Sequence, residues 1–124
     1  MLASQRIVQV CLVLFAAIGV CGGILQMLRG QPETSPRLDN VHRFMAGVYL
    51  GTGVICGWAA WTVTEQRTLV YLIALGIFLA GVGRLISIRK VGLPKPSGVW
   101  IAYMIPELGL PPVMVAAQLL SRVV

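Results

Sequence analysis

Long runs of apolar residues alternate with short polar segments along this chain. Four such runs cover residues 7–28, 41–63, 68–88 and 99–120. Each is close to the roughly 20 residues that a helix needs to cross a bilayer. Unpaired backbone groups are costly in hydrocarbon, so spanning segments of this kind are expected to be helices. The pattern predicts an all-α integral membrane protein, a four-transmembrane-helix bundle that forms a single domain over residues 1–124.

The polar segments between the runs are short. Residues 31–38 contain two prolines and are predicted to be a loop, and Asp39 with Asn40 is predicted to cap the helix that follows. Residues 64–67 leave room only for a tight turn, so the second and third helices should be antiparallel neighbours. Residues 89–97 form a basic connector with two further prolines.

Composition supports a membrane location. Hydrophobic residues make up 57% of the chain and charged residues only 11%, whereas soluble domains average about 25% charged. The net charge is +6, but the basic residues lie between apolar runs rather than along one polar face. This arrangement argues against a nucleic-acid partner and favours contact with membrane lipids.

Basic residues are unevenly shared between the two predicted sides of the membrane. The side with the first and third loops holds seven, against three (Arg6, Arg67 and Arg122) on the other. The seven are Arg29, Arg37, Arg43, Arg84, Arg89, Lys90 and Lys95. The positive-inside rule therefore predicts that loops one and three are cytoplasmic.

The chain contains few of the residues that enzymes and metal sites use. One histidine and the scattered Cys11, Cys21 and Cys56 cannot supply a metal-ligand set. Nucleophile elbows, phosphate loops and dinucleotide glycine patterns are also missing. No metal or cofactor is expected, and a non-enzymatic role is favoured. A small membrane enzyme with Glu107 as its base is a more remote alternative.

Three charged residues lie within the predicted spans, where a charge costs several kcal/mol and marks a candidate site. These are Arg43, Arg84 and Glu107, and the topology places all three in the same half of the bilayer. Small residues recur at four-residue spacing beside both arginines, which predicts packing stripes that point them inward. The stripes are Arg43–Gly47–Gly51 and Gly76–Ala80–Arg84.

The fourth run adds three prolines near its only acid. Pro106, Pro111 and Pro112 remove backbone donors, so the helix should kink beside Glu107. Together with nearby polar residues, the buried charges predict one inward polar pocket. Its expected lining is Asp39, Arg43, Tyr49, Arg84, Ser87, Tyr103 and Glu107.

Two interpretations of this pocket remain open. Arginine donates paired hydrogen bonds to phosphate and carboxylate, so the pocket suits the head group of an anionic lipid-like or isoprenoid ligand. Alternatively, the charges form a structural ion network. The chain would then be a structural or accessory subunit of a larger membrane complex, or part of a homo-oligomer.

Several short stretches together resemble a known family. Residues 39–51 (DNVHRFMAGVYLG), residues 83–87 (GRLIS), the Gly92-Leu93-Pro94 turn and Glu107 are similar to the domain-of-unknown-function 4345 proteins, over about residues 39–118. The resemblance implies a four-helix membrane fold and a bacterial inner membrane. It also implies that the typical polar positions of the family are Asp39, Arg43, Tyr49, Arg84, Ser87 and Glu107. It implies no particular activity.

Overall fold

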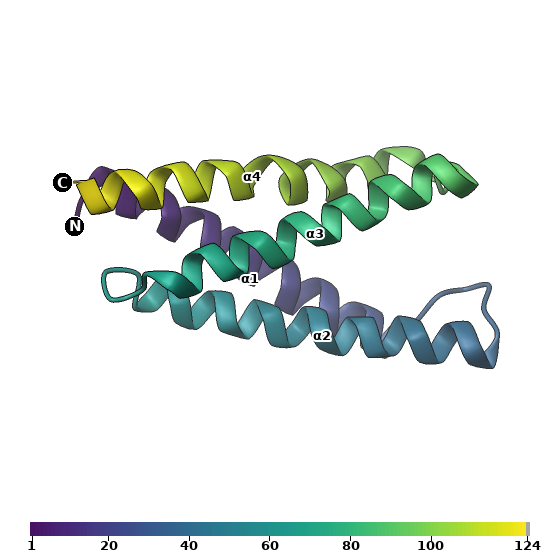
Figure 1. Cartoon of the computed structure of the whole chain (residues 1–124). Helices are drawn as coiled ribbons and strands as arrows, with labels where there is room; N and C mark the ends of the chain where they lie inside the picture. Colours follow the sequence, from purple (N-terminus) through teal and green to yellow (C-terminus); the bar gives the residue numbers. More distant parts are fainter. Residues whose placement is uncertain (124) are drawn as a thin grey trace. The chain divides into compact units, whose positions relative to one another are not determined.

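A computed structural model describes residues 1–123, with the side chains of residues 1–121. This part of the chain contains four helices and no strand (Figure 1). They are α1 (Ala3–Arg29), α2 (Pro36–Trp61), α3 (Thr68–Val91) and α4 (Ser97–Val123). All four are long and apolar enough to cross a membrane. The prediction of an all-α membrane protein with four spanning helices is confirmed.

The helix α2 begins earlier than predicted. Ser35 is its N-cap, and the Ser35 hydroxyl accepts a hydrogen bond from the amide of Leu38 at 3.3 Å. Pro36 occupies the first turn, where its missing amide costs nothing and its fixed φ suits a helix. The prediction that Asp39 caps α2 is therefore wrong. Asp39 lies within the first turn, from which its carboxylate reaches Arg43 one turn later.

The chain divides into two compact units. Residues 9–63 form the α1–α2 unit, which holds most of α1 and all of α2. Residues 1–8 and 64–123 form the α3–α4 unit, which adds the start of α1 to α3 and α4. A hydrogen bond of 2.7 Å between the hydroxyls of Ser4 and Ser121 ties the start of α1 to the end of α4 within that unit.

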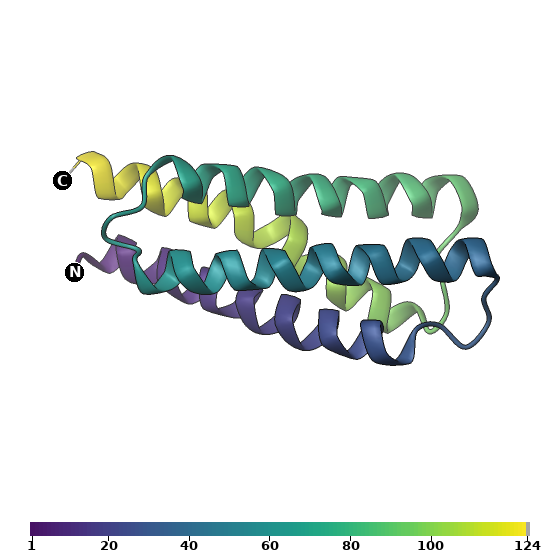
Figure 2. The ribbon, with the colours of Figure 1, turned by 90° about the horizontal axis from the view of Figure 1, so that it is seen from below.

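Within the α1–α2 unit, the two helices approach at backbone distance (Figure 2). A Cβ atom added to Gly53 would lie 2.7 Å from the amide nitrogen of Val20. A Cβ on Gly19 would lie 2.8 Å from the carbonyl oxygen of Tyr49, and one on Gly23 would lie 2.8 Å from the nitrogen of Leu50. Only glycine permits such contact, which is how membrane helices gain packing energy without a hydrophobic driving force.

The predicted glycine stripes are confirmed only in part, since Arg43 contacts Met27 of α1 and a Cβ added to Gly47 would lie 3.4 Å from Cε of Met27. Among the described residues, a Cβ added to Gly51 or Gly76 would meet nothing within 4 Å, and Ala80 is exposed. The closest approaches of α2 and α3 to their partner helices are made at Gly53 and at Gly81. Small size permits close packing, but it does not say which of several neighbouring small residues faces the partner helix.

The helix α4 continues without a break through Pro106, Pro111 and Pro112. Each proline lacks an amide and leaves a carbonyl one turn earlier without its helical donor. One of these carbonyls belongs to Glu107, four residues before Pro111. The acid of α4 therefore lies in a stretch whose backbone is already more polar than that of an ordinary spanning helix.

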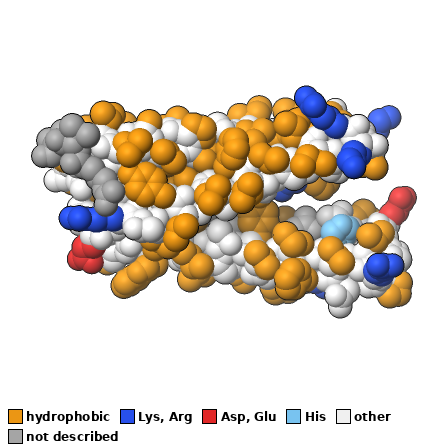
Figure 3. Space-filling model, viewed as in Figure 1, with side chains coloured by type: hydrophobic (Ala, Val, Ile, Leu, Met, Phe, Trp, Pro, Cys, Tyr) orange, Lys and Arg blue, Asp and Glu red, His pale blue; other side chains and the backbone are white. Residues whose placement is uncertain are grey.

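The surface matches a hydrocarbon environment. On the face shown in Figure 3, hydrophobic side chains cover the length of the helices, and charged side chains gather near the helix ends. Large apolar side chains are widely exposed, including Phe44 at 66%, Ile105 at 64% and Trp61 at 85%. Lipid is the solvent that such a surface requires.

Candidate functional site

The central feature of the α3–α4 unit is an ion pair between its two long helices. The Nε atom of Arg84 in α3 donates to Oε2 of Glu107 in α4 at 2.7 Å. The side chain of Glu107 is 7% exposed and that of Arg84 is 26% exposed. Gly81, one turn before Arg84, lets α4 come close, since a Cβ there would lie 3.2 Å from Cβ of Glu107. The buried carboxylate thus has the cationic partner that burial demands.

Two aromatic rings from α4 complete the surroundings of Arg84. Its Cζ atom lies 5.8 Å from the ring centroid of Trp100 and 5.6 Å from that of Tyr103. The two rings meet edge to face, with centroids 6.3 Å apart. Positions 100, 103 and 107 are spaced by three and four residues and so share one face of α4. All three side chains therefore point to the guanidinium of Arg84. We refer to Arg84, Trp100, Tyr103 and Glu107 as the Arg84 cluster.

A second charged group joins the two helices of the α1–α2 unit. Arg43 pairs with Asp39 one turn earlier, with Nε 3.0 Å from Oδ2 and 3.2 Å from Oδ1. Its Nη1 atom donates to the carbonyl oxygen of Met27, in the last turn of α1. Gly30 ends that helix with φ +65°, and a Cβ there would lie 2.9 Å from Nη2 of Arg43. Arg43 therefore caps the C-terminus of α1, where carbonyls lack donors and the helix dipole is negative.

We expect Arg43→Gln to lower the free energy of unfolding by about 1 kcal/mol, because it removes a charge-assisted bond whose donor is 42% exposed and partly screened. Arg37→Gln is the matched control, since Arg37 is an exposed residue of the same helix, and it should change stability by less than about 0.5 kcal/mol. Thermal unfolding in detergent followed by circular dichroism measures both. Equal effects of the two substitutions would contradict the capping role.

Comparison with known proteins supplies the family. The family model described as "Domain of unknown function (DUF4345)" matches residues 4–118. The chain belongs to the DUF4345 family. The match begins near the start of α1, so it covers this helix as well as the three that the resemblance in the sequence had included. No curated protein and no solved structure matches the chain.

The predicted site residues of this DUF4345 protein fall into both units. Arg84, Tyr103 and Glu107 come together in the α3–α4 unit, as the topology and helix faces predict. Asp39 and Arg43 come together in the α1–α2 unit. The backbone carbonyl of Tyr49 lies at the close contact with Gly19 of α1. Ser87 is an exposed residue of α3. A single pocket lined by all seven predicted residues stays a prediction.

Two glutamines with structural roles were missed by the sequence reasoning. The amide of Gln9 in α1 donates to the carbonyl oxygen of Ala60 at 3.0 Å. Gln118 in α4 is 4% exposed, and its side-chain amide donates to the carbonyl oxygen of Gln66 at 2.9 Å. Each satisfies a carbonyl beside the α2–α3 turn. An isolated glutamine in an otherwise apolar span was the available signal, because a polar side chain in hydrocarbon requires a partner.

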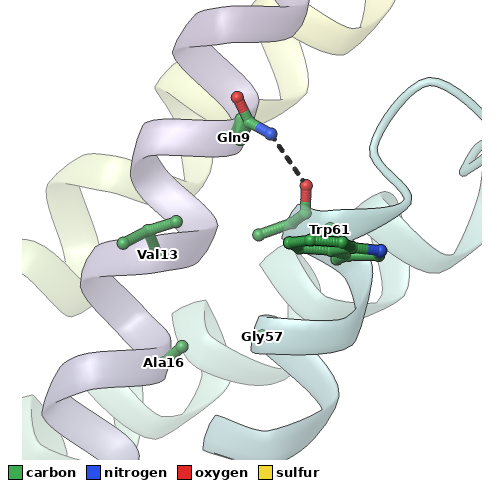
Figure 4. Close-up of a pocket in the computed structure, with 6 residues that line it drawn as sticks. Gln9, Val13, Ala16, Gly57 and Trp61 are labelled. Carbon is green, nitrogen blue, oxygen red and sulfur yellow. Dashed lines mark hydrogen bonds between the residues drawn. The ribbon is translucent and has the colours of Figure 1, made fainter.

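A crevice of about 280 Å³ lies beside the first of these glutamines (Figure 4). It is lined by Gln9, Val13, Ala16, Gly57, Ala60 and Trp61. The ring of Trp61 lies over Gly57, and the dashed line marks the bond from Gln9. The lining is mostly apolar, the amide of Gln9 already donates to Ala60, and none of the predicted site residues is included. The crevice has the chemistry of a hydrocarbon contact rather than of a polar binding site.

The described residues also bear on metal binding. Within them, no three His, Cys, Asp or Glu side chains are grouped so as to hold a metal ion. The candidate chemistry is therefore that of the Arg84 cluster, which combines one cation, one acid and two aromatic rings.

Proposed function

We propose that this DUF4345 protein binds the anionic head group of a membrane lipid or isoprenoid lipid at the Arg84 cluster. The observation that carries the proposal is that Arg84 is held in place on three sides and is still 26% exposed. The ion pair and the two rings keep the Arg84 side chain at the cluster, and its exposed part is where a head group can approach. The planar fork of Arg84 also matches the geometry of phosphate and carboxylate groups.

The charges at this end of the α3–α4 unit favour an anion. Four basic residues, Arg84, Arg89, Lys90 and Lys95, lie in the second half of α3 and in its connector, against the one acid Glu107. Arg84 is seven residues before the end of α3, about 10 Å along the helix axis. Aromatic residues such as Trp100 and Tyr103 are typical of the membrane interface. This depth suits a lipid whose chains remain in the bilayer.

The test compares two variants in which a whole ion pair is neutralised. Arg84→Gln with Glu107→Gln removes the cluster charges, and Asp39→Asn with Arg43→Gln does the same in the α1–α2 unit, so both keep the net charge of +6. Native mass spectrometry in mild detergent would count lipids retained from an equimolar mixture of phosphatidylglycerol and phosphatidylcholine. We expect the first variant alone to lose the preference for phosphatidylglycerol, by about tenfold.

Two further arms fix the interpretation of that experiment. Inorganic phosphate at the same concentration should not displace the lipid, because it lacks the chains that hold the head group in place. Displacement would mean that the cluster recognises a free phosphate instead. If the Arg84–Glu107 double variant keeps the lipid preference of the wild type, the proposal is wrong.

The second candidate is a structural role, and the closed ion pair favours it. A contact of 2.7 Å to a carboxylate that is 7% exposed is also what a pair needs in order to hold α3 against α4. The chain would then be a structural or accessory subunit of a larger membrane complex or of a homo-oligomer. Two results together would select this role. The neutral double variant would retain lipids as the wild type does, and the wild-type protein would purify as an oligomer or with a second protein bound.

We extend the proposal to a bacterial inner membrane with residues 30–35 and 92–96 in the cytoplasm. The excess of basic residues on that side supports it. A cysteine placed in the 92–96 connector should be shielded from membrane-impermeant thiol reagents in intact cells. Labelling of this cysteine from outside the cell would show that the protein has the opposite orientation.

A further inference from the structure

We infer that Glu107 restrains lipid binding at Arg84, because its carboxylate occupies the guanidinium that a head group would use; this inference rests on the proposed function. The contact from Nε of Arg84 to Oε2 of Glu107, at 2.7 Å, is a full charge-assisted hydrogen bond. A phosphate that approaches the same guanidinium meets a second anion at close range. Like charges at one site repel each other, so the head group must either share Arg84 with Glu107 or replace it.

The two partners of the ion pair differ in freedom. Glu107 is 6% exposed as a residue, and its Cβ lies in the close contact with α3 that Gly81 permits. Arg84 is partly exposed and has a long, flexible side chain whose charged end can reach toward the interface. A head group that replaces the carboxylate would therefore draw Arg84 outward, while Glu107 stays buried.

Because Glu107 stays buried when Arg84 moves, each binding event carries an unfavourable free-energy contribution. When Arg84 turns to the ligand, a buried carboxylate loses all or part of its partner. Only head groups with a full negative charge gain enough from Arg84 to offset that loss. Glu107 thus acts as an internal competitor that keeps affinity low and excludes head groups with no net charge.

The test uses Glu107→Gln and Glu107→Asp in the same equimolar lipid mixture. The first removes the competing charge, and the second withdraws it by one methylene. We expect Glu107→Gln to raise the retained ratio of phosphatidylglycerol to phosphatidylcholine by about two- to fivefold, and Glu107→Asp to raise it by less. Glu65→Gln is the matched control, since it makes the same chemical change at an exposed acid of the α2–α3 turn, outside the predicted pocket, and it should leave the ratio unchanged.

The possible outcomes separate this inference from the proposed function. If the neutral Arg84–Glu107 double variant loses the lipid preference but Glu107→Gln does not exceed the wild type, the restraint is wrong and the lipid site stands. If the double variant retains the preference, both are wrong. Should Glu107→Gln fail to fold, Glu107→Asp decides the question, because a ratio no higher than that of the wild type overturns the inference.

Discussion

Replacing Glu107 with alanine is expected to lower the free energy of unfolding by about 3 kcal/mol. The substitution leaves Arg84 without the carboxylate that lies 2.7 Å from its Nε atom, within a helix that crosses the membrane. Breaking a buried pair by removing one partner costs about 3–5 kcal/mol. The lower end applies here because Arg84 is 26% exposed, which lets its charge reach the interface. Unfolding in detergent, followed by circular dichroism, gives the change directly.

Two comparisons show whether this loss comes from the stranded charge. Glu65→Ala removes an exposed acid from the α2–α3 turn and should change stability by less than about 0.5 kcal/mol. The double variant with glutamine at positions 84 and 107 should recover most of the lost stability, because neither charge is left alone. If Glu107→Ala is as mild as Glu65→Ala, the ion pair does not hold α3 to α4.

Substituting alanine for Gly53 is expected to destabilise the α1–α2 unit by about 2 kcal/mol. The new Cβ would lie 2.7 Å from the nitrogen of Val20 and 3.0 Å from the carbonyl carbon of Gly19. Both are backbone atoms of α1, so no side chain can turn aside and the helices must separate. Overpacking of this kind typically costs 1–3 kcal/mol.

Gly51→Ala provides a control in the same helix. It makes the same chemical change and brings the same gain in helix propensity, but among the described residues its Cβ meets nothing within 4 Å. We expect its stability to lie within about 0.5 kcal/mol of the wild type in the same unfolding assay. Equal losses at positions 51 and 53 would mean that the close helix contact is not where the structure places it.

Much of the candidate site could be predicted from the pattern of polar residues. A charge inside an apolar span requires a partner, and the alternating direction of the spans brings Arg84 and Glu107 to the same depth. Positions 103 and 107 share one face of α4, which accounts for the placement of Tyr103. The pair between α3 and α4 followed from these two rules. The backbone partner of Arg43 did not, because Met27 contributes a carbonyl that no residue type reveals.

The predicted cap of α2 was wrong, and the predicted glycine stripes were right only in part, for different physical reasons. Both Ser35 and Asp39 are good helix caps, and the choice between them depended on where the chain leaves its connector and on Pro36 in the first turn. The glycines of α2 and α3 offered several possible stripes. Gly53 and Gly81 were selected by the direction of the partner helix, which a one-dimensional spacing does not contain.

The sequence by itself determined that four helices form, where each helix begins and ends to within five residues, and that the charge of Arg84 in α3 requires a partner such as Glu107 in α4. These features depend on the length of apolar runs and on the cost of unpaired charge in lipid, which are local or pairwise properties. The tertiary structure decided which small residues meet, that Arg43 caps the C-terminus of α1, and that the acid of the Arg84 cluster is the more deeply buried partner. Those outcomes depend on the rotation and approach of whole helices, which many residues set together.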